Sequence, residues 1–265
     1  MKFSTAVILC GGKGTRLGSL GEKIPKTLVN VEGYPILWYI IFSLIRNSIN
    51  HLILPLGYKG EMIKKFIKKK FQKNNQLFKI DLIDTGKNTS IAKRINKVKK
   101  FIKSKNFVLL NGDAIFDFDL NKIFLNHEKK NTIATFLCGY APLDYGVISK
   151  EKNKIINFTR EINFNTVLSS DNKKILSFVY SGMVILNKIT IKSNFKHYEN
   201  FEKKLYPKLI KKYQTNLINI KGFWHSIDSI KDLERLSKKK NFKKFKDLLK
   251  IRKKNEEYEQ KFLEK

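Results

Sequence analysis

Cysteine and arginine are scarce in this 265-residue sequence, and each shortage argues against a class of protein. The two cysteines, Cys10 and Cys138, are too few for a disulfide framework or a cysteine-based zinc site. Only six of the 54 basic residues are arginine, the side chain that reads phosphate and guanine best. Apolar runs fall short of the ~20 residues that a membrane span requires, and the N-terminus lacks the long apolar core of a signal peptide. We therefore expect a cytoplasmic protein without a membrane span.

Positive charge is abundant, with 54 Lys and Arg against 23 Asp and Glu and a net charge of +31. The lysines occur in every segment, commonly beside Asn and Ile, which is typical of a solvated surface. We expect no nucleic-acid partner for the chain as a whole, although the field would attract small polyanions such as nucleotides. The 42% hydrophobic share is that of an ordinary globular chain with a packed core.

The last 28 residues differ from the rest in charge density. Residues 238–265 contain twelve Lys and Arg against five Asp and Glu, with apolar residues at helical spacing. We predict one domain over residues 1–237 and a basic, amphipathic helical extension over 238–265. Docking of this helix on the domain is the simpler interpretation; contact with an anionic membrane or RNA is the alternative.

Short apolar runs alternate with segments of helical period through the first 130 residues. The predicted strands in this part are 3–9, 52–54, 80–83 and 107–110. One predicted helix begins at Tyr34-Pro35, and two others cover residues 60–71 and 91–102. Beyond Thr132 we predict strands at 132–138, 146–149, 155–159, 175–179, 183–186 and 216–220, and a helix at 201–212. This order predicts an α/β fold: a Rossmann-like, mostly parallel sheet with helices on both faces.

A glycine-rich segment follows the first predicted strand. Ligands of such sheets bind beyond the carboxyl ends of the strands, where Gly11-Gly12-Lys13-Gly14-Thr15-Arg16 stands. Glycines let backbone N–H groups approach phosphate oxygens, and Arg16 adds a bidentate cation. Pro25-Lys26 follows at a spacing that can return a second cation to the same place. The segment therefore predicts a phosphate-binding loop.

This loop, with Pro25-Lys26, resembles the signature of the sugar-1-phosphate nucleotidyltransferases, and the similarity extends over roughly residues 3 to 236. Asn111-Gly112-Asp113 belongs to this general similarity. Elements most similar to the glucose-1-phosphate cytidylyltransferase branch are Pro35-Ile36-Leu37-Trp38, Gly57-Tyr58-Lys59-Gly60, Asp84-Thr85-Gly86 and Gly222-Phe223-Trp224. Segments similar to the mannose- and heptose-1-phosphate guanylyltransferases are Asn200-Phe201-Glu202-Lys203 and Tyr206-Pro207-Lys208-Leu209.

The resemblance implies that a sugar 1-phosphate attacks the α-phosphorus of a nucleoside triphosphate and releases pyrophosphate. It implies a Mg²⁺ ion held by Asp113 and Asp228, whose hard oxygens suit that metal. Each carboxylate also has an ordinary reading, Asn-Gly-Asp as a turn and Ser226-Ile227-Asp228 as the cap of a helix. The histidines form no triad with a G-x-S-x-G serine, and an anionic phosphate needs no protein nucleophile.

The resemblance assigns the remaining site residues to three groups. The catalytic residues would be Arg16, Lys26 and Asp113. The nucleotide would contact Leu9, Gly11, Gly12, Gly14, Thr15, Arg16, Lys26, Thr85, Gly86, Lys93 and Gly112. The sugar phosphate would contact Tyr145, Gly146, Arg160, Glu161, Ser181, Gly182 and Glu202. For Glu202, the first turn of a helix is an equally ordinary explanation.

Three departures from the family pattern fall on the base and sugar halves of the site. Ala92-Lys93 replaces a Gly-Gly before Arg94, so we predict that Lys93 reaches the base or ribose. Arg160-Glu161 stands where the family usually carries a Glu-Lys pair, and Arg160 could supply the missing charge. Tyr180-Ser181-Gly182 stands where an Asn-Gly-Gly-like run often contacts the sugar.

Together, the sequence predicts a Mg²⁺-dependent, homo-oligomeric enzyme that transfers a nucleotidyl group, from CTP first, to a hexose 1-phosphate. The alternatives are guanylyl transfer from GTP to a mannose- or heptose-type phosphate, and a non-catalytic relative that binds a ligand and regulates. The product, a nucleotide-activated sugar, would serve polysaccharide synthesis.

Overall fold

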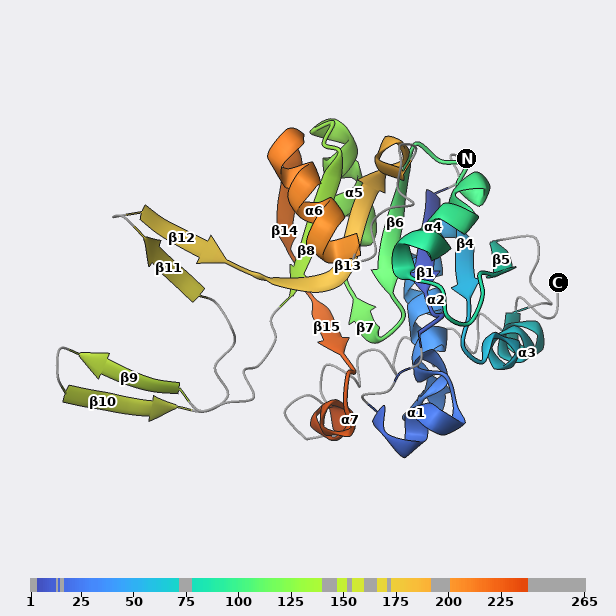
Figure 1. The fold of residues 1–265 in the computed structure, drawn as a ribbon, viewed down its shortest axis with the longest axis horizontal. Helices are drawn as coiled ribbons and strands as arrows, with labels where there is room; N and C mark the ends of the chain where they lie inside the picture. Colours follow the sequence, from blue (N-terminus) through green and yellow to red (C-terminus); the bar gives the residue numbers. More distant parts are fainter. Residues whose placement is uncertain are drawn as a thin grey trace.

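The fold is that of a computed structural model (Figure 1). It describes residues 4–12, 14, 17–71, 78–139, 147–151, 154–159, 166–170, 173–191 and 201–237. The predicted helical extension over 238–265 lies outside these residues. None of the described helices is both long and apolar enough to cross a membrane.

A seven-stranded sheet forms the centre of the structure, in the order β14-β8-β13-β6-β1-β4-β5. Its strands are β1 (Ser4–Leu9), β4 (Ile49–Leu56), β5 (Lys79–Asp84), β6 (Asn106–Asn111), β8 (Ala134–Gly139), β13 (Val179–Asn187) and β14 (Thr215–Asn219). Every neighbouring pair is parallel except the two pairs that β13 makes, with β6 and β8. The mostly parallel sheet predicted from the sequence is therefore confirmed.

Both faces of this sheet are covered by helices, because its strands are apolar at successive positions. Alternate residues point to opposite faces, so Ile8 and Val7 of β1 enter two different buried clusters. The cluster containing Ile8 includes residues of α2 (Ile36–Arg46), α3 (Gly60–Phe71) and α5 (Leu120–Lys129). The cluster containing Val7 includes residues of α4 (Ile91–Val98) and α6 (Phe201–Lys212).

Four two-stranded pairs stand beside the main sheet. They are β2 (Asn30–Val31) with β3 (Tyr34–Pro35), β7 (Ala114–Asp117) with β15 (Phe223–Ser226), β9 (Val147–Glu151) with β10 (Lys154–Thr159), and β11 (Thr166–Ser170) with β12 (Lys173–Ser177). The hairpins β9–β10 and β11–β12 lie apart from the sheet, at the left of Figure 1. The other helices are α1 (Ser19–Lys23), α7 (Ile230–Ser237) and the 3₁₀ turns η2 (Lys26–Leu28), η4 (Lys99–Phe101) and η5 (Lys188–Ile191).

The local structure differs from the sequence prediction in several places. The strand predicted at 175–179 is divided between the end of β12 and the start of β13. Pro35 is the extended N-cap of α2 rather than a residue of its first turn. The helix predicted over 91–102 ends at Val98 and continues as the 3₁₀ turn η4. Helix α5 was not predicted, although its start carries a recognisable cap, the Asp119 side chain accepting a hydrogen bond from the Lys122 N–H at 2.9 Å.

A buried histidine makes the stability of this fold depend on pH. The Nδ1 atom of His127 lies 2.9 Å from Thr135 Oγ1 and 3.1 Å from Thr132 Oγ1, while its Nε2 is buried with no hydrogen-bond partner among the described residues. Burial lowers the pKa of His127 from 6.5 to about 4. Between these two pH values, His127 is therefore protonated in the unfolded chain but neutral in the folded state.

We expect the free energy of unfolding to fall as the pH drops from about 6.5 towards 4, by about 3 kcal/mol from His127. Above that range the group is neutral in both states and contributes no pH dependence. Urea unfolding between pH 4 and 8 measures the slope in the wild-type protein and in His127→Gln, which cannot titrate. Identical slopes in the two proteins would show that His127 is not the group responsible.

Candidate active site

The site lies where three neighbouring parallel strands end. Leu9 ends β1, Asn111 ends β6 and Leu56 ends β4, and the turns beyond them are tied together. The N–H of Gly112 donates to the Leu9 carbonyl at 3.0 Å, and the N–H of Tyr58 donates to the Gly11 carbonyl at 3.1 Å. These bonds place the predicted phosphate loop beside the turn that carries Asp113.

Glycine is required at Gly112 by close packing. A Cβ atom there would lie 2.6 Å from the Thr27 methyl carbon and 2.8 Å from the Leu9 carbonyl oxygen. Gly14 has a left-handed backbone, with φ of 65°, and its Cβ would lie 3.1 Å from that of Lys26. A side chain at Gly112 would therefore collide with Thr27 and Leu9, and one at Gly14 would crowd Lys26.

A cavity of about 370 Å³ opens between these turns. Its lining comes from the phosphate loop, η2, the start of α4 and the β6–β7 turn: Leu9, Cys10, Gly11, Gly12, Gly14, Lys26, Thr27, Thr89, Ser90, Ile91, Arg94, Asn111, Gly112 and Asp113. Seven of the residues predicted to bind the nucleotide or to be catalytic are among them: Leu9, Gly11, Gly12, Gly14, Lys26, Gly112 and Asp113.

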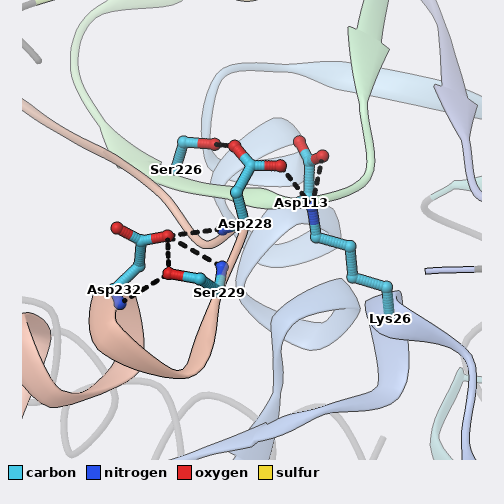
Figure 2. A network of polar contacts seen from close by, with 6 residues as sticks. All are labelled: Lys26, Asp113, Ser226, Asp228, Ser229 and Asp232. Atoms are coloured by element: carbon cyan, nitrogen blue, oxygen red, sulfur yellow. Dashed lines mark hydrogen bonds and ion pairs between the residues drawn. The ribbon is translucent and has the colours of Figure 1, made fainter. Parts of the chain in front are cut away.

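At one end of the cavity an ammonium group meets two carboxylates. The Nζ atom of Lys26 lies 2.8 Å from Asp113 Oδ2 and 2.8 Å from Asp228 Oδ1. Figure 2 shows the three side chains converging from separate segments of the chain. Asp228 arrives there because β15 pairs with β7, and the Ile227 N–H donates to the Asp113 carbonyl at 2.8 Å.

The two carboxylates determine the charge state of Lys26. Burial alone would lower the pKa of Lys26, but the charges and hydrogen bonds of Asp113 and Asp228 outweigh it and raise the pKa above its usual value. Lys26 is therefore a fixed cation at neutral pH. The pair of carboxylates, in turn, already holds a cation between its oxygens.

Asp228 is held in place by two residues that the sequence analysis did not identify. The Ser226 hydroxyl donates to Asp228 Oδ2 at 3.0 Å, which leaves Oδ1 for Lys26 (Figure 2). Asp232 Oδ2 accepts the N–H groups of Asp228 at 3.0 Å and Ser229 at 2.8 Å. Ser229 and Asp232 form a capping box at the start of α7, a signal present in the sequence as Ser-x-x-Asp.

Several predicted nucleotide contacts lie elsewhere. Thr85 is fully buried, and its hydroxyl donates to the Leu56 carbonyl at 2.5 Å. Neither Thr85 nor Gly86 lines the cavity, and Lys93 is exposed on α4 and outside the lining. The next residue, Arg94, lines it instead and is 5% exposed. The predicted reach of Lys93 to the base or ribose therefore has no support in this cavity, and Thr85 acts within the protein interior.

The predicted sugar contacts that the structure describes lie on the β13 side of Asp113. Ser181 is buried, with its hydroxyl donating to the Leu137 carbonyl at 2.7 Å. Gly182, with φ of 77°, packs so closely that a Cβ would lie 2.8 Å from Nδ2 of Asn111. Glu202 lies on α6 and is exposed, although partial desolvation and the negative charge of Asp113 raise its pKa.

The other predicted site residues fall outside the part of the chain that the structure describes. They are Thr15, Arg16, Tyr145, Gly146, Arg160 and Glu161. Their roles stay predictions from the sequence.

Comparison with known proteins identifies the family of the chain. The family model described as "Nucleotidyl transferase" matches residues 5–241. The chain belongs to this nucleotidyl transferase family. The resemblance to sugar-1-phosphate nucleotidyltransferases seen in the sequence is thereby confirmed, as is the fold class.

Two kinds of enzyme are among the proteins similar to this chain. A probable glucose-1-phosphate cytidylyltransferase of Bacillus subtilis is 28% identical over 250 residues, which cover 88% of this chain and 94% of that protein. A D-glycero-alpha-D-manno-heptose 1-phosphate guanylyltransferase of Campylobacter jejuni is 35% identical over 159 residues, covering 59% of this chain and 68% of that protein.

Among solved structures, HddC from Yersinia pseudotuberculosis, complexed with GMP-PN, superposes with a TM-score of 0.65. It is 22% identical, and the match covers 88% of this chain and 97% of that one. At this identity the likeness supports the fold.

Proposed function

We propose that this protein transfers a nucleotidyl group from a nucleoside triphosphate to a sugar 1-phosphate, with CTP and a hexose 1-phosphate as the preferred pair. Nucleotidyl transfer to sugar 1-phosphates is the activity that the family and its relatives support. The observation that carries the proposal is the meeting of Lys26 and Asp113, which line the cavity together with several glycines, and Asp228, which contacts Lys26.

In the proposed reaction a phosphate oxygen of the sugar 1-phosphate forms a bond to the α-phosphorus of the triphosphate. The bond from that phosphorus to the oxygen bridging to the β-phosphate breaks, and pyrophosphate leaves with the electron pair. The nucleophile is already anionic, so the protein must chiefly bring two polyanions together and stabilise the charge of the leaving group.

The residues of this chain suit that task. Gly11, Gly12 and Gly14 line the cavity, where their backbone N–H groups would bind phosphate oxygens, and Lys26, a further lining residue, supplies a positive charge. Arg16, predicted from the sequence to grip the β- and γ-phosphates, belongs to the same loop.

Asp113 and Asp228 fit a magnesium ion. Their oxygens Oδ2 and Oδ1 already converge on one cationic nitrogen, and two carboxylates with substrate phosphates are a usual ligand set for Mg²⁺. When bound, the ion would neutralise phosphate charge and polarise the phosphoryl oxygens. Asp113 and Asp228 would hold it, and Ser226 would orient Asp228.

The cytidylyl preference rests on the relative matched over most of its length, the Bacillus subtilis protein. Guanylyl transfer to a heptose-type phosphate is the second candidate, favoured by the higher identity to the Campylobacter jejuni protein over a shorter segment.

A panel of substrates tests the proposal. The full chain, with Mg²⁺, is incubated with each of CTP, GTP, UTP, ATP and dTTP against glucose, mannose and heptose 1-phosphates, and pyrophosphate release is measured. We expect the fastest release with CTP and a hexose 1-phosphate. Fastest release with GTP would replace the cytidylyl assignment by the guanylyl one. If no pair of substrates released pyrophosphate while calorimetry still detected nucleotide binding, catalysis would be refuted and a ligand-binding regulator indicated.

A further inference from the structure

One buried side chain in the cavity wall has no role in the reaction described above. Arg94, on α4, donates four hydrogen bonds from its guanidinium: Nη1 to the Leu56 carbonyl at 2.9 Å and to Thr85 Oγ1 at 2.6 Å, and Nη2 to the Gly11 carbonyl at 3.0 Å and to the Lys87 carbonyl at 3.3 Å. It is 5% exposed.

These acceptors belong to the ends of three neighbouring strands. Gly11 follows β1, Leu56 ends β4, and Thr85 follows β5. The strands are adjacent in the sheet, in the order β1-β4-β5. A single planar group on α4 thus joins the phosphate loop to the two turns beside it.

The guanidinium also occupies the space that side chains would fill at two glycines. A Cβ atom on Gly11 would lie 2.4 Å from Arg94 Nη1, and one on Gly57 would lie 2.3 Å from the same atom. The backbone of the loop therefore packs directly against the guanidinium, and any displacement of Arg94 removes both a hydrogen bond and a packing surface from Gly11.

Arg94 is a poor candidate for a direct phosphate ligand. A guanidinium has five N–H groups, and four hydrogen bonds to protein acceptors use most of them. If the guanidinium left these acceptors to bind a ligand, buried carbonyl groups would lose their hydrogen bonds, which costs free energy.

We propose that Arg94 is a positioning residue, which holds Gly11 and the start of the phosphate loop in the conformation that receives the triphosphate. This inference rests on the proposed function for its nucleotide. According to this inference, Arg94 rather than Lys93 is the residue of α4 that affects nucleotide binding. Arg94 would do so by holding the backbone of the loop in place.

Two variants test the proposal from different sides. Arg94→Lys keeps a charge but loses the planar fork that reaches two pairs of acceptors. Gly57→Ala keeps Arg94 and adds a Cβ where the guanidinium lies, although Gly57 itself does not line the cavity. Lys97→Met is the matched control: Lys97 lies on the same helix and donates to the Thr85 carbonyl at 2.8 Å, but is not a lining residue.

Three quantities are measured on the full chain: hydrogen exchange of the amides of Gly11, Gly12 and Gly14 without nucleotide, CTP and GTP affinity by calorimetry, and kcat and KM for the better nucleotide. In both test variants we expect loop exchange to accelerate and affinity to fall by about tenfold or more, the scale of one lost charged hydrogen bond. KM should rise by more than kcat falls. Lys97→Met should resemble the wild type in all three.

Other results would overturn the proposal. Weaker nucleotide binding in Arg94→Lys with unchanged loop exchange, and normal binding in Gly57→Ala, would make Arg94 a direct ligand. Faster exchange throughout the protein, with a lower unfolding temperature, would make it a general structural residue. If the wild-type protein turns over no triphosphate, the proposed function fails, but loop exchange and nucleotide affinity still decide the role of Arg94.

Discussion

Lys26→Met should lower kcat by ~100-fold or more, the usual scale for losing one preorganised charge contact. The ammonium of Lys26 is the cation that both Asp113 and Asp228 fix at 2.8 Å, and these carboxylates keep it protonated. Methionine preserves the length of the side chain and removes the charge. Steady-state kinetics with CTP and glucose 1-phosphate, or with the pair that the substrate panel selects, measures the loss.

Lys23→Met is the control for that experiment, since Lys23 lies in the last turn of α1 and is exposed. It changes the net charge by the same amount, so it accounts for any general weakening of the positive field around the protein. We expect it to retain near-normal kcat. If Lys26→Met retained near-normal turnover as well, Lys26 would have no part in the chemistry.

Asp113→Asn should weaken metal binding by about 100-fold or more, because even outer partners of metal ligands change affinity by about 10- to 100-fold. An amide oxygen has no charge with which to hold a divalent cation. Titration with Mn²⁺, followed by electron paramagnetic resonance in the presence of nucleotide, measures binding without relying on catalysis. Activity should require more Mg²⁺ in the variant, and chelation of the metal should abolish wild-type activity.

Asp117→Asn provides the comparison. Asp117 ends β7, four residues after Asp113, and pairs on the surface with Arg46 at 3.1 Å. Removing its charge changes the net charge equally but leaves Asp113 and Asp228 intact, so metal affinity should stay at the wild-type value. Equal Mn²⁺ affinity in Asp113→Asn and the wild type would exclude Asp113 as a ligand.

The meeting of Lys26, Asp113 and Asp228 was predicted partly from local sequence and partly from the family resemblance. Asp113 follows a clearly apolar strand, and the carboxyl ends of parallel strands meet at one edge. Lys26 and Asp228 were placed by the family resemblance rather than by periodicity. The centre of the sheet was predictable because β1, β4 and β6 are buried along nearly their whole length and show as continuous apolar runs.

The burial of Arg94 was not predictable from pattern alone. Apolar periodicity gives the buried face of α4 as Ala92, Ile95 and Val98, and a charged residue is ordinarily assigned to solvent. Arg94 is buried because four polar acceptors from distant segments surround it, and no local window contains them. Strands β7 and β15 escaped prediction similarly, as each is four residues long and is defined by pairing across the chain.

The contact between Lys26 and Asp228 joins residues 202 positions apart. During synthesis the ribosome releases Lys26 long before Asp228, so the amino-terminal strands can assemble while the carboxylate pair is still incomplete. A nascent chain that ends before the turn after β15 lacks Asp228, so its Lys26 and Asp113 have no second carboxylate beside them. With the role proposed for Asp228, the enzyme would become active only after almost all of the family domain has been translated, and an unfinished polypeptide would consume no nucleotide.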